Sequence, residues 1–454
     1  MREYCYLTAV ELSDLIKARE VSVEEVIRSH LKHIEEIEDR VKAWTFLDKE
    51  RVIQRAIELD EKLIGESAKG SLYGIPVGIK DIFNTYDMPT GMGSPQWEGF
   101  TPGNDARCVH YLRMNNAVFP GKTVTAEFAV HAPGKTLNPY NPEYSPGTSS
   151  SGSAAAVASF MVPLSIGTQT AGSIIRPASY CGVYGFKPSF GLIPRTGALK
   201  TADTLDTVGM FARSPQDLRL LFEVMRVWGE NFPISNKILN DKLRQKKGQR
   251  PWRVAVIPEL TKRFSKPYAY KAVTSLIEKL EEKNDVELVT ADFPIDIEEA
   301  FEIHTTLYEK SLSYYFQREF SNTVFISKII HGMISRGSAI TVDEYTVAVE
   351  KQDLLYKRLD DFFSKYDLIL TLSTQGIAPK MGDDDSFDTC FLWTLCGAPV
   401  INIPIGKGPQ DMPFGVQIVG RRYNDYLLLR FSELLADYVG QRQNIFSGEE
   451  KINI

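Results

Sequence analysis

The hydrophobic and polar positions of the chain follow a helical period at first and then change. In residues 1–64 apolar side chains recur at helical spacing, and capping boxes starting at Thr8 and Ser22 mark two helix N-termini. A third helix is predicted over residues 49–63. These helices also carry many charged positions, so we expect them to form a scaffold layer.

From residue 73 onwards short apolar segments alternate with helical ones. A strand over residues 75–79 ends in Lys80, and a helix over residues 106–115 precedes a strand over residues 117–120. Alternation of this kind predicts an α/β protein with a layered sheet. The rest of the pattern predicts a helix at 214–228, a strand at 253–257, a helix at 268–283, a strand at 286–289, a long helical region at 297–363, a strand at 368–372, a helix at 391–395, strands at 400–403 and 414–419, and a final helix from Asp425.

Residues 145–188 form a segment that is almost free of charge, in a chain that is 24% charged. It is rich in glycine and serine, with an Ala-rich helix predicted over residues 153–160 and a buried strand over residues 163–166. Small residues at this density allow backbone to approach backbone or a ligand. Flexible linkers of similar composition lack the apolar filling, so we predict a rigid core segment that presents hydroxyl groups.

Composition and charge narrow the class of protein. The 454 residues include 52 basic and 58 acidic side chains, a net charge of −6 without long runs, so no electrostatic footprint for nucleic acid is present. The basic-leaning residues 237–253 are interpreted as a solvated connection. Five scattered cysteines predict free thiols in a reducing compartment. With no signal-peptide pattern and no long apolar run, we expect a soluble cytoplasmic protein that binds neither nucleic acid nor membrane.

Several motifs fail on inspection. The GKT sequences at residues 121–123 and 134–136 lack the earlier glycine of a phosphate-binding loop. His30 and His33 lie close in sequence, but no third metal ligand is evident, so we expect packing or surface roles for them. The nearest match to a nucleophile elbow, residues 147–151, ends in Ser151 where glycine is required. The serines therefore need another interpretation.

Lys80 offers one. A serine hydroxyl is a weak nucleophile and needs a base, and a lysine can serve when burial keeps it neutral. Lys80 ends the apolar strand at residues 75–79. By itself the position fits a solvated, strand-capping lysine at least as well as a functional one.

The combination of motifs resembles the amidase signature family. The lysine strand reads GIPVGIKD at residues 74–81, the serine-rich loop GTSSSGSAAA at 147–156, the nucleophile turn GTQTAGS at 167–173, and the signature continues as RPASYCGVYGFKP at 176–188. Later pieces also match, namely LDTVG at 205–209, CGAPVINIP at 396–404 and PFGVQIVG at 413–420. The resemblance covers residues 8–436 and is weakest over residues 230–360.

The resemblance implies a fold and a mechanism. The fold is one large α/β domain with a mixed central sheet covered by helices on both faces. The mechanism uses Ser173 as the acylated nucleophile, Ser149 as the proton relay after a cis peptide bond from Thr148, and Lys80 as the neutral base. The proposed oxyanion hole comprises the backbone N–H groups of Thr170, Ala171, Gly172 and Ser173. Ser150 would orient Lys80 or simply structure the loop; no metal or organic cofactor is implied.

Departures from the common pattern bear on the substrate. Thr148 and Ala171 stand where glycine is usual, without loss of a backbone N–H, and Gln169 replaces the frequent aspartate. Arg176 lies three residues after the nucleophile, which looks most like the malonamidase branch, where the equivalent arginine grips a carboxylate. Arg176 and Gln169 are therefore the predicted substrate-binding residues. A structural arginine that bonds nearby carbonyl groups is the alternative for Arg176.

We expect one domain over residues 1–454. Its predicted parts are the helical layer at 1–64, the catalytic core at 74–213, a surface connection at 230–251, and the remaining sheet and substrate-pocket helices at 252–454. The favoured function is hydrolysis of a small, carboxylate-bearing amide to acid and ammonia by a homodimer. The alternatives are a role as the amidase component of a tRNA-dependent amidotransferase and, remotely, an inactive scaffold.

Overall fold

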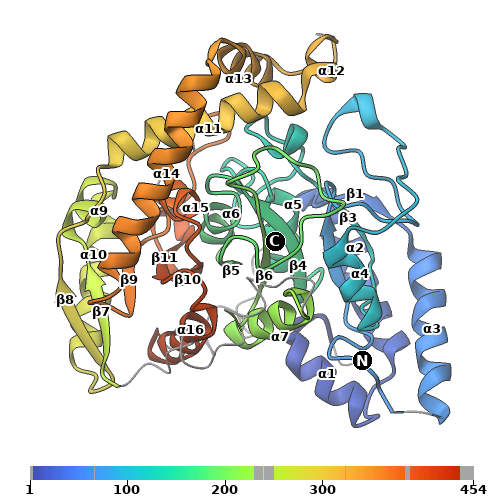
Figure 1. The fold of residues 1–454 in the computed structure, drawn as a ribbon. Coiled ribbons are helices and arrows are strands. Elements are labelled where there is room, and N and C mark those ends of the chain that lie inside the picture. Colours follow the sequence, from blue (N-terminus) through green and yellow to red (C-terminus); the bar gives the residue numbers. More distant parts are fainter. Residues whose placement is uncertain are drawn as a thin grey trace.

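One mixed sheet of eleven strands runs through the molecule (Figure 1). The computed structural model describes residues 4–65, 67–229, 239, 250–322, 324–383 and 389–439. Neighbouring strands are antiparallel through the middle of the sheet and parallel towards both ends, except for the outermost pair at one end, which is antiparallel. In spatial order the strands are β1 (Trp44–Leu47), β3 (Gly121–Thr123), β2 (Val77–Lys80), β4 (Leu164–Gln169), β6 (Thr207–Ala212), β5 (Tyr184–Lys187), β10 (Val400–Lys407), β11 (Pro413–Gly420), β9 (Leu368–Leu372), β7 (Trp252–Val256) and β8 (Val286–Thr290).

Helices flank this sheet (Figure 1). Capping boxes at Thr8 and Ser22 begin the first two helices, as predicted, and a third capping box, at Thr341, begins a later helix. The α-helices are α1 (Ala9–Lys17), α2 (Val23–Val41), α3 (Lys49–Gly65), α4 (Arg107–Met114), α5 (Ser151–Ala158), α6 (Ile175–Tyr180), α7 (Pro215–Met225), α9 (Pro258–Arg263), α10 (Pro267–Glu281), α11 (Ile297–Tyr315), α12 (Gln317–Phe320), α13 (Lys328–Ala339), α14 (Val342–Phe362), α15 (Cys390–Leu395) and α16 (Asp425–Val439).

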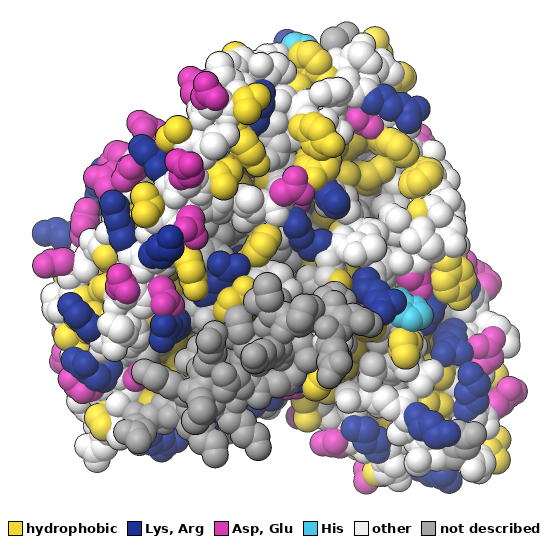
Figure 2. Space-filling view, viewed as in Figure 1, with side chains coloured by type: hydrophobic (Ala, Val, Ile, Leu, Met, Phe, Trp, Pro, Cys, Tyr) yellow, Lys and Arg dark blue, Asp and Glu magenta, His cyan; other side chains and the backbone are white. Residues whose placement is uncertain are grey.

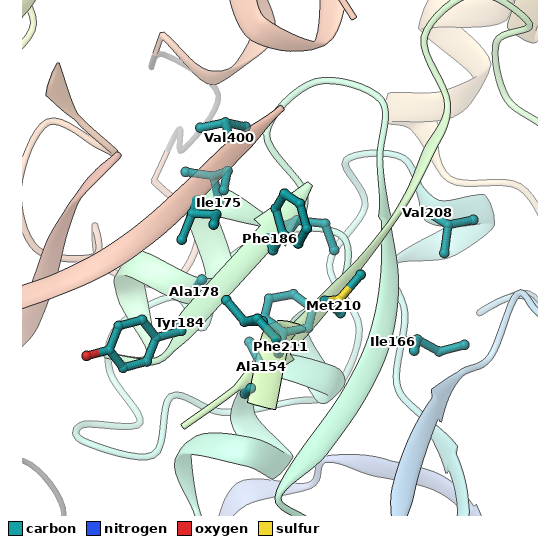
Figure 3. Packing of buried hydrophobic residues seen from close by; sticks show 14 of the residues in the cluster. Ala154, Ile166, Ile175, Ala178, Tyr184, Phe186, Val208, Met210, Phe211 and Val400 are labelled. Atoms are coloured by element: carbon teal, nitrogen blue, oxygen red, sulfur yellow. The ribbon is translucent and has the colours of Figure 1, made fainter. Parts of the chain in front are cut away.

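Strand β5 shows how the two faces of the sheet are built. Successive side chains of a strand point to opposite faces. The Phe186 ring packs edge-on against Phe222 of α7, whereas a Cβ at the neighbouring Gly185 would lie 2.5 Å from the Ala178 Cβ of α6. Figure 3 shows Ala178 of α6 packed close to the strand that carries Phe186. Helices α6 and α7 therefore cover opposite faces, and the missing side chain at Gly185 lets α6 lie close to the sheet.

The predicted α/β fold with a mixed sheet and helices on both faces is confirmed, and most predicted elements exist within a few residues. The strand predicted at 117–120 lies instead at Gly121–Thr123. Strand β6 falls between residues 188 and 214, where the sequence pattern predicts no strand, because a fully buried strand containing a glycine shows no alternation. The long helical region at 297–363 consists of four helices, α11 to α14.

The predicted surface connection at 230–251 lies outside the described residues except for 239, 250 and 251. Within the described part of the chain, no helix combines the length and the apolar character needed to cross a membrane.

Candidate active site

Strand β2 delivers Lys80 to the centre of the molecule. The strand is fully buried between β3 and β4, and the Lys80 side chain has no exposed surface. Its Nζ lies 2.8 Å from Ser149 Oγ, 2.9 Å from Ser150 Oγ and 3.2 Å from Thr168 Oγ1. The structure thus brings Lys80 together with both serines named for it from the sequence, and adds Thr168, which sequence reasoning did not single out.

The surroundings of Lys80 favour its neutral form. Burial lowers the pKa of its ammonium group well below the usual 10.5, and the carboxylate of Asp206 opposes this shift only in part. The Ser150 hydroxyl donates to the Thr168 carbonyl at 3.2 Å, so Ser150 Oγ accepts from Lys80. A neutral Lys80 that donates to Ser150 and to Thr168 keeps its lone pair for the proton of Ser149.

The serine-rich loop is fixed at the N-terminus of α5. The peptide bond between Thr148 and Ser149 is cis, as the resemblance implies, and Ser150 is the N-terminal flanking residue of the helix. Ser149 and Ser150 are both buried. A Cβ at Gly167 of β4 would lie 2.7 Å from Ser150 Oγ, so this glycine leaves the room in which the serines reach Lys80.

Ser173 lies in the turn that joins β4 to α6. Within the described ranges, the backbone N–H groups of Ala171, Gly172 and Ser173 make no hydrogen bond to another protein group. Gly172 is buried, whereas Ala171 and Ser173 are partly exposed, and buried N–H groups without a partner are rare in folded proteins. This turn therefore presents adjacent donors beside the Ser173 hydroxyl, the arrangement expected of an oxyanion hole.

Asp206 anchors one end of the turn. Its carboxylate accepts hydrogen bonds from Thr170 Oγ1 at 2.7 Å and from the Thr201 backbone N–H at 2.8 Å. The carboxylate thereby joins the turn to the segment before β6. Its place in the LDTVG motif was the only sequence signal for this residue, and that signal assigned it no role.

Gln169 has a different place from the one expected. Its side chain is fully buried, and its Oε1 accepts from the N–H groups of Ile174 and Ile175 at 2.9 and 3.0 Å. Its Nε2 donates to Thr394 Oγ1 at 3.0 Å. Both ends of the amide are thus engaged within the protein. The expectation that Gln169 contacts the substrate is corrected to a role in holding the start of α6.

Arg176 lies on the inner side of a pocket beside this turn. Only 2% of it is exposed, and a Cβ on Gly172 would lie 2.9 Å from its guanidinium nitrogen. Arg176, Ala171 and Thr148 all line the same pocket. A cation here lies next to the proposed oxyanion hole, so the structure brings the predicted substrate-binding arginine and the proposed reaction centre together.

Helices α11 and α13, here called the helical wall, form the other side of the pocket, which has a volume of about 880 Å³. The apolar contributions to the lining include Phe301, Ile329 and Met333, and Arg336 Nε pairs with Glu309 Oε1 at 2.9 Å. Figure 2 shows hydrophobic side chains gathered at the top of the view, over α11 to α13. The pocket therefore combines a polar floor with a partly apolar wall.

His304 of α11 is the residue that sequence reasoning missed most completely. It lines the pocket, is 5% exposed, and its Nε2 lies 2.9 Å from the Thr170 carbonyl oxygen. It belongs to no motif and falls where the family resemblance is weakest. Its place on the buried face of an amphipathic helix was the only signal, and such a place is typical of core residues.

Other predictions concern metals and thiols. The described residues contain no group of three or more His, Cys, Asp and Glu side chains that could hold a metal ion. His30 is buried with Nδ1 2.9 Å from the Val26 carbonyl, and His33 Nε2 lies 2.8 Å from the Ser159 carbonyl, which are packing roles as expected. All five cysteines are free and buried.

Comparisons with known proteins identify the family. A family model described as Amidase matches residues 25–429. The glutamyl-tRNA(Gln) amidotransferase of Clostridium novyi has a subunit that is 30% identical to this chain over 467 residues, covering 93% of this chain and 95% of that protein. Its counterpart in Agathobacter rectalis is 29% identical over 472 residues, with 93% and 92% covered.

Solved structures share the fold. A crystal structure of an amidase superimposes with a TM-score of 0.84 at 25% identity, covering 96% of this chain and all of that one. The peptide amidase of Stenotrophomonas maltophilia gives 0.81 at 23% identity, with 95% and 97% covered, and a bacterial aryl acylamidase of the amidase signature family gives 0.85 at 19%, with 98% and 99% covered. The malonamidase branch stays a prediction. This chain belongs to the amidase family, has the amidase signature fold, and is an enzyme that acts on amide C–N bonds.

Proposed function

We propose that the protein hydrolyses a small, carboxylate-bearing amide to the acid and ammonia through an acyl-enzyme on Ser173. The observation that carries the proposal is the buried Lys80 with its lowered pKa, hydrogen-bonded to Ser149, whose neighbour Thr148 lines the pocket. A neutral amine in this place is a base for a hydroxyl group.

The proposed reaction begins with proton transfer. Lys80 takes the proton of Ser149 as Ser149 takes that of Ser173, and Ser173 Oγ bonds to the amide carbon. The oxyanion of the tetrahedral intermediate accepts from the N–H groups of the turn at Thr170–Ser173. The C–N bond then breaks, and the leaving nitrogen receives its proton through Ser149. Water repeats the sequence on the acyl-enzyme and releases the acid.

Arg176 supports the choice of substrate class. Its guanidinium group lies beside Gly172, close to where the scissile carbonyl would sit, and a planar guanidinium can bind a carboxylate with two parallel hydrogen bonds. The pocket also presents Lys328 and Arg336, against Glu309 and Asp383. A substrate with a carboxylate a few bonds from the amide would reach Arg176 and the turn together.

The test is a screen for ammonia release by the purified protein. The panel contains ω-carboxy amides, neutral aliphatic and aryl amides, ureas and glutamine, and Ser173→Ala serves as the matched inactive variant. We expect release from ω-carboxy amides, abolished in Ser173→Ala with an unchanged circular dichroism spectrum. Equal release by the variant would remove Ser173 from the mechanism. A preference for neutral amides would contradict the proposal that the substrate carries a carboxylate.

A second candidate is supported by the two curated relatives, which are matched over nearly their whole length and are named as amidotransferase subunits. On this hypothesis the chain supplies ammonia to partner proteins. Affinity purification from native cells, followed by the molar mass in solution, separates the candidates. A homodimer that hydrolyses amides alone supports the first, and stoichiometric partners on which glutaminase activity depends support the second.

A further inference from the structure

Two side chains from outside residues 145–188 bind the backbone carbonyl groups of the turn that carries Ser173. His304 of α11 lies with Nε2 2.9 Å from the Thr170 oxygen, and Thr394 of α15 donates its hydroxyl hydrogen to the Ala171 oxygen at 2.8 Å. Gln169 in turn donates to Thr394 at 3.0 Å. Consecutive carbonyl groups of the turn are thus held from two different helices.

Holding these carbonyl groups also orients the N–H groups between them. In a trans peptide the C=O of one residue and the N–H of the next point in opposite directions across one rigid plane. The bond from His304 therefore sets the direction of the Ala171 N–H, and the bond from Thr394 sets that of the Gly172 N–H. In the described part of the chain both N–H groups are left without a protein acceptor, as donors to an oxyanion must be.

The chemistry of His304 suits this task. A carbonyl oxygen can only accept, so the proton is on Nε2 and the ring is the Nε2–H tautomer. Burial lowers the pKa of His304 to about 4; the bond to Thr170 opposes the shift, and His131 and Arg176 reinforce it. The rings of Tyr308 and Phe391 pack against the imidazole at centroid distances of 5.8 and 5.7 Å. The ring is therefore a neutral donor held in one orientation.

We propose that His304 is a positioning residue for the oxyanion hole, which fixes the Thr170–Ala171 peptide from the helical wall while Thr394 fixes the following one. The inference rests on the proposed function, because it assigns to this turn the stabilisation of the tetrahedral intermediate. It also makes the helical wall part of the machinery for bond cleavage as well as of the pocket.

The test compares His304→Phe, which keeps a ring but removes the donor, with His304→Gln, whose amide nitrogen can take the place of Nε2. Two readouts are used: steady-state hydrolysis of the best amide of the panel, and the rate at which a fluorophosphonate reagent labels Ser173, followed by mass spectrometry. The labelling needs no known substrate. The phosphoryl oxygen of the reagent accepts from the same backbone N–H groups as the oxyanion would. Ser311→Ala is the matched control, since its hydroxyl bonds to the Leu307 carbonyl of the same helix.

In His304→Phe we expect kcat and the labelling rate to fall about tenfold or more, with KM changed much less. The reason is that the carbonyl oxygen of the substrate becomes negatively charged only in the transition state. His304→Gln should recover most of the loss, and Ser311→Ala should match the wild type. Thr394→Val removes the other anchor and should show the same loss of kcat. It serves as the test if His304→Phe does not fold.

Two results would overturn the inference: normal kcat and labelling in His304→Phe and Thr394→Val, or a Gln variant no better than Phe. In either case the loss of both readouts in Ser173→Ala would leave the proposed function standing. If Ser173→Ala instead still hydrolyses the amide, the proposed function fails and the role of His304 fails with it.

Discussion

The buried segment at residues 145–188 and the helical wall of α11 and α13 face each other across the pocket but are built in opposite ways. The segment is uncharged up to Arg176 and almost entirely buried, and most of its side chains are small. The wall is amphipathic, and Phe301 and Ile329 are about half exposed at 48% and 47%. One side tolerates little change, whereas the other keeps much of its surface in solvent.

This difference separates two tasks. Backbone donors and a neutral lysine need fixed positions, which close packing of small residues provides. A pocket wall needs only shape and charge, and it can vary without disturbing the sheet. His304 is the exception among the wall residues, because it bonds to the Thr170 carbonyl of the turn and therefore needs a fixed position. The sharpest tests of the comparison change one side at a time.

The largest effect is expected from Lys80→Ala and Ser149→Ala. Each removes one member of the proton path that leads from Ser173 to Lys80, and we expect kcat/KM to fall about 10⁴-fold or more. Ammonia release under single-turnover conditions measures the loss, with the thermal midpoint as the control for folding. Substantial activity in Lys80→Ala would remove this lysine from the mechanism.

The pH dependence should follow the same group. Lys80 acts only when neutral, so kcat/KM should rise about tenfold per pH unit on the acid limb. Because burial lowers the pKa of Lys80, this limb should level off well below pH 10.5. Burial also lowers the pKa of Lys187 to about 7, away from the pocket, so the unfolding midpoint is followed over the same range. Activity that is flat down to acid pH would contradict a lysine base.

Arg176→Ala should separate substrate classes. A charge-assisted hydrogen bond contributes roughly 1.5–3 kcal/mol, so we expect carboxylate-bearing amides to lose about 100-fold in kcat/KM and neutral amides to lose little. Arg176→Lys keeps the charge without the planar guanidinium group. Its kcat/KM on carboxylate-bearing amides should fall between those of the wild type and Arg176→Ala. A similar loss on both classes would assign Arg176 to structure.

The smallest effects should come from three glycines, and they should differ in sign. Gly185→Ala places a Cβ 2.5 Å from Ala178, and Gly337→Ala overlaps the Glu309 carbonyl where α13 crosses α11, so each should cost about 1–3 kcal/mol. At Gly332, also on α13, the new Cβ meets only the end of the Arg336 side chain at 3.5 Å. There alanine should stabilise by about 0.5–1 kcal/mol through its helix propensity.

Denaturant unfolding of the three variants measures these free energies, with the wild type as reference. Destabilisation by Gly332→Ala equal to that by Gly185→Ala would mean that the pocket side of the wall is packed as tightly as the buried segment. The contrast drawn between the two sides of the pocket would then be wrong.

Much of the fold was predictable because its signals are local. Capping boxes, helical periods and the short apolar strand before Lys80 depend on neighbours in sequence, and the structure has them within a few residues. Strand β6 was missed because its residues are buried on both faces and show no alternation. Gln169 was misassigned because position in a motif does not say which way a side chain points.

The sequence alone determined the alternating α/β pattern and the uncharged segment at residues 145–188, and its resemblance to a family selected Lys80, Ser149 and Ser173 as candidate catalytic residues. It could do so because these residues lie in continuous motifs. Only the tertiary structure decided that Thr168 joins Lys80, that Asp206 anchors the turn and that His304 bonds to the Thr170 carbonyl. These three contacts join residues that lie 88, 36 and 134 positions apart in the chain. Packing of the sheet and helices brings such segments together, and no local pattern encodes it.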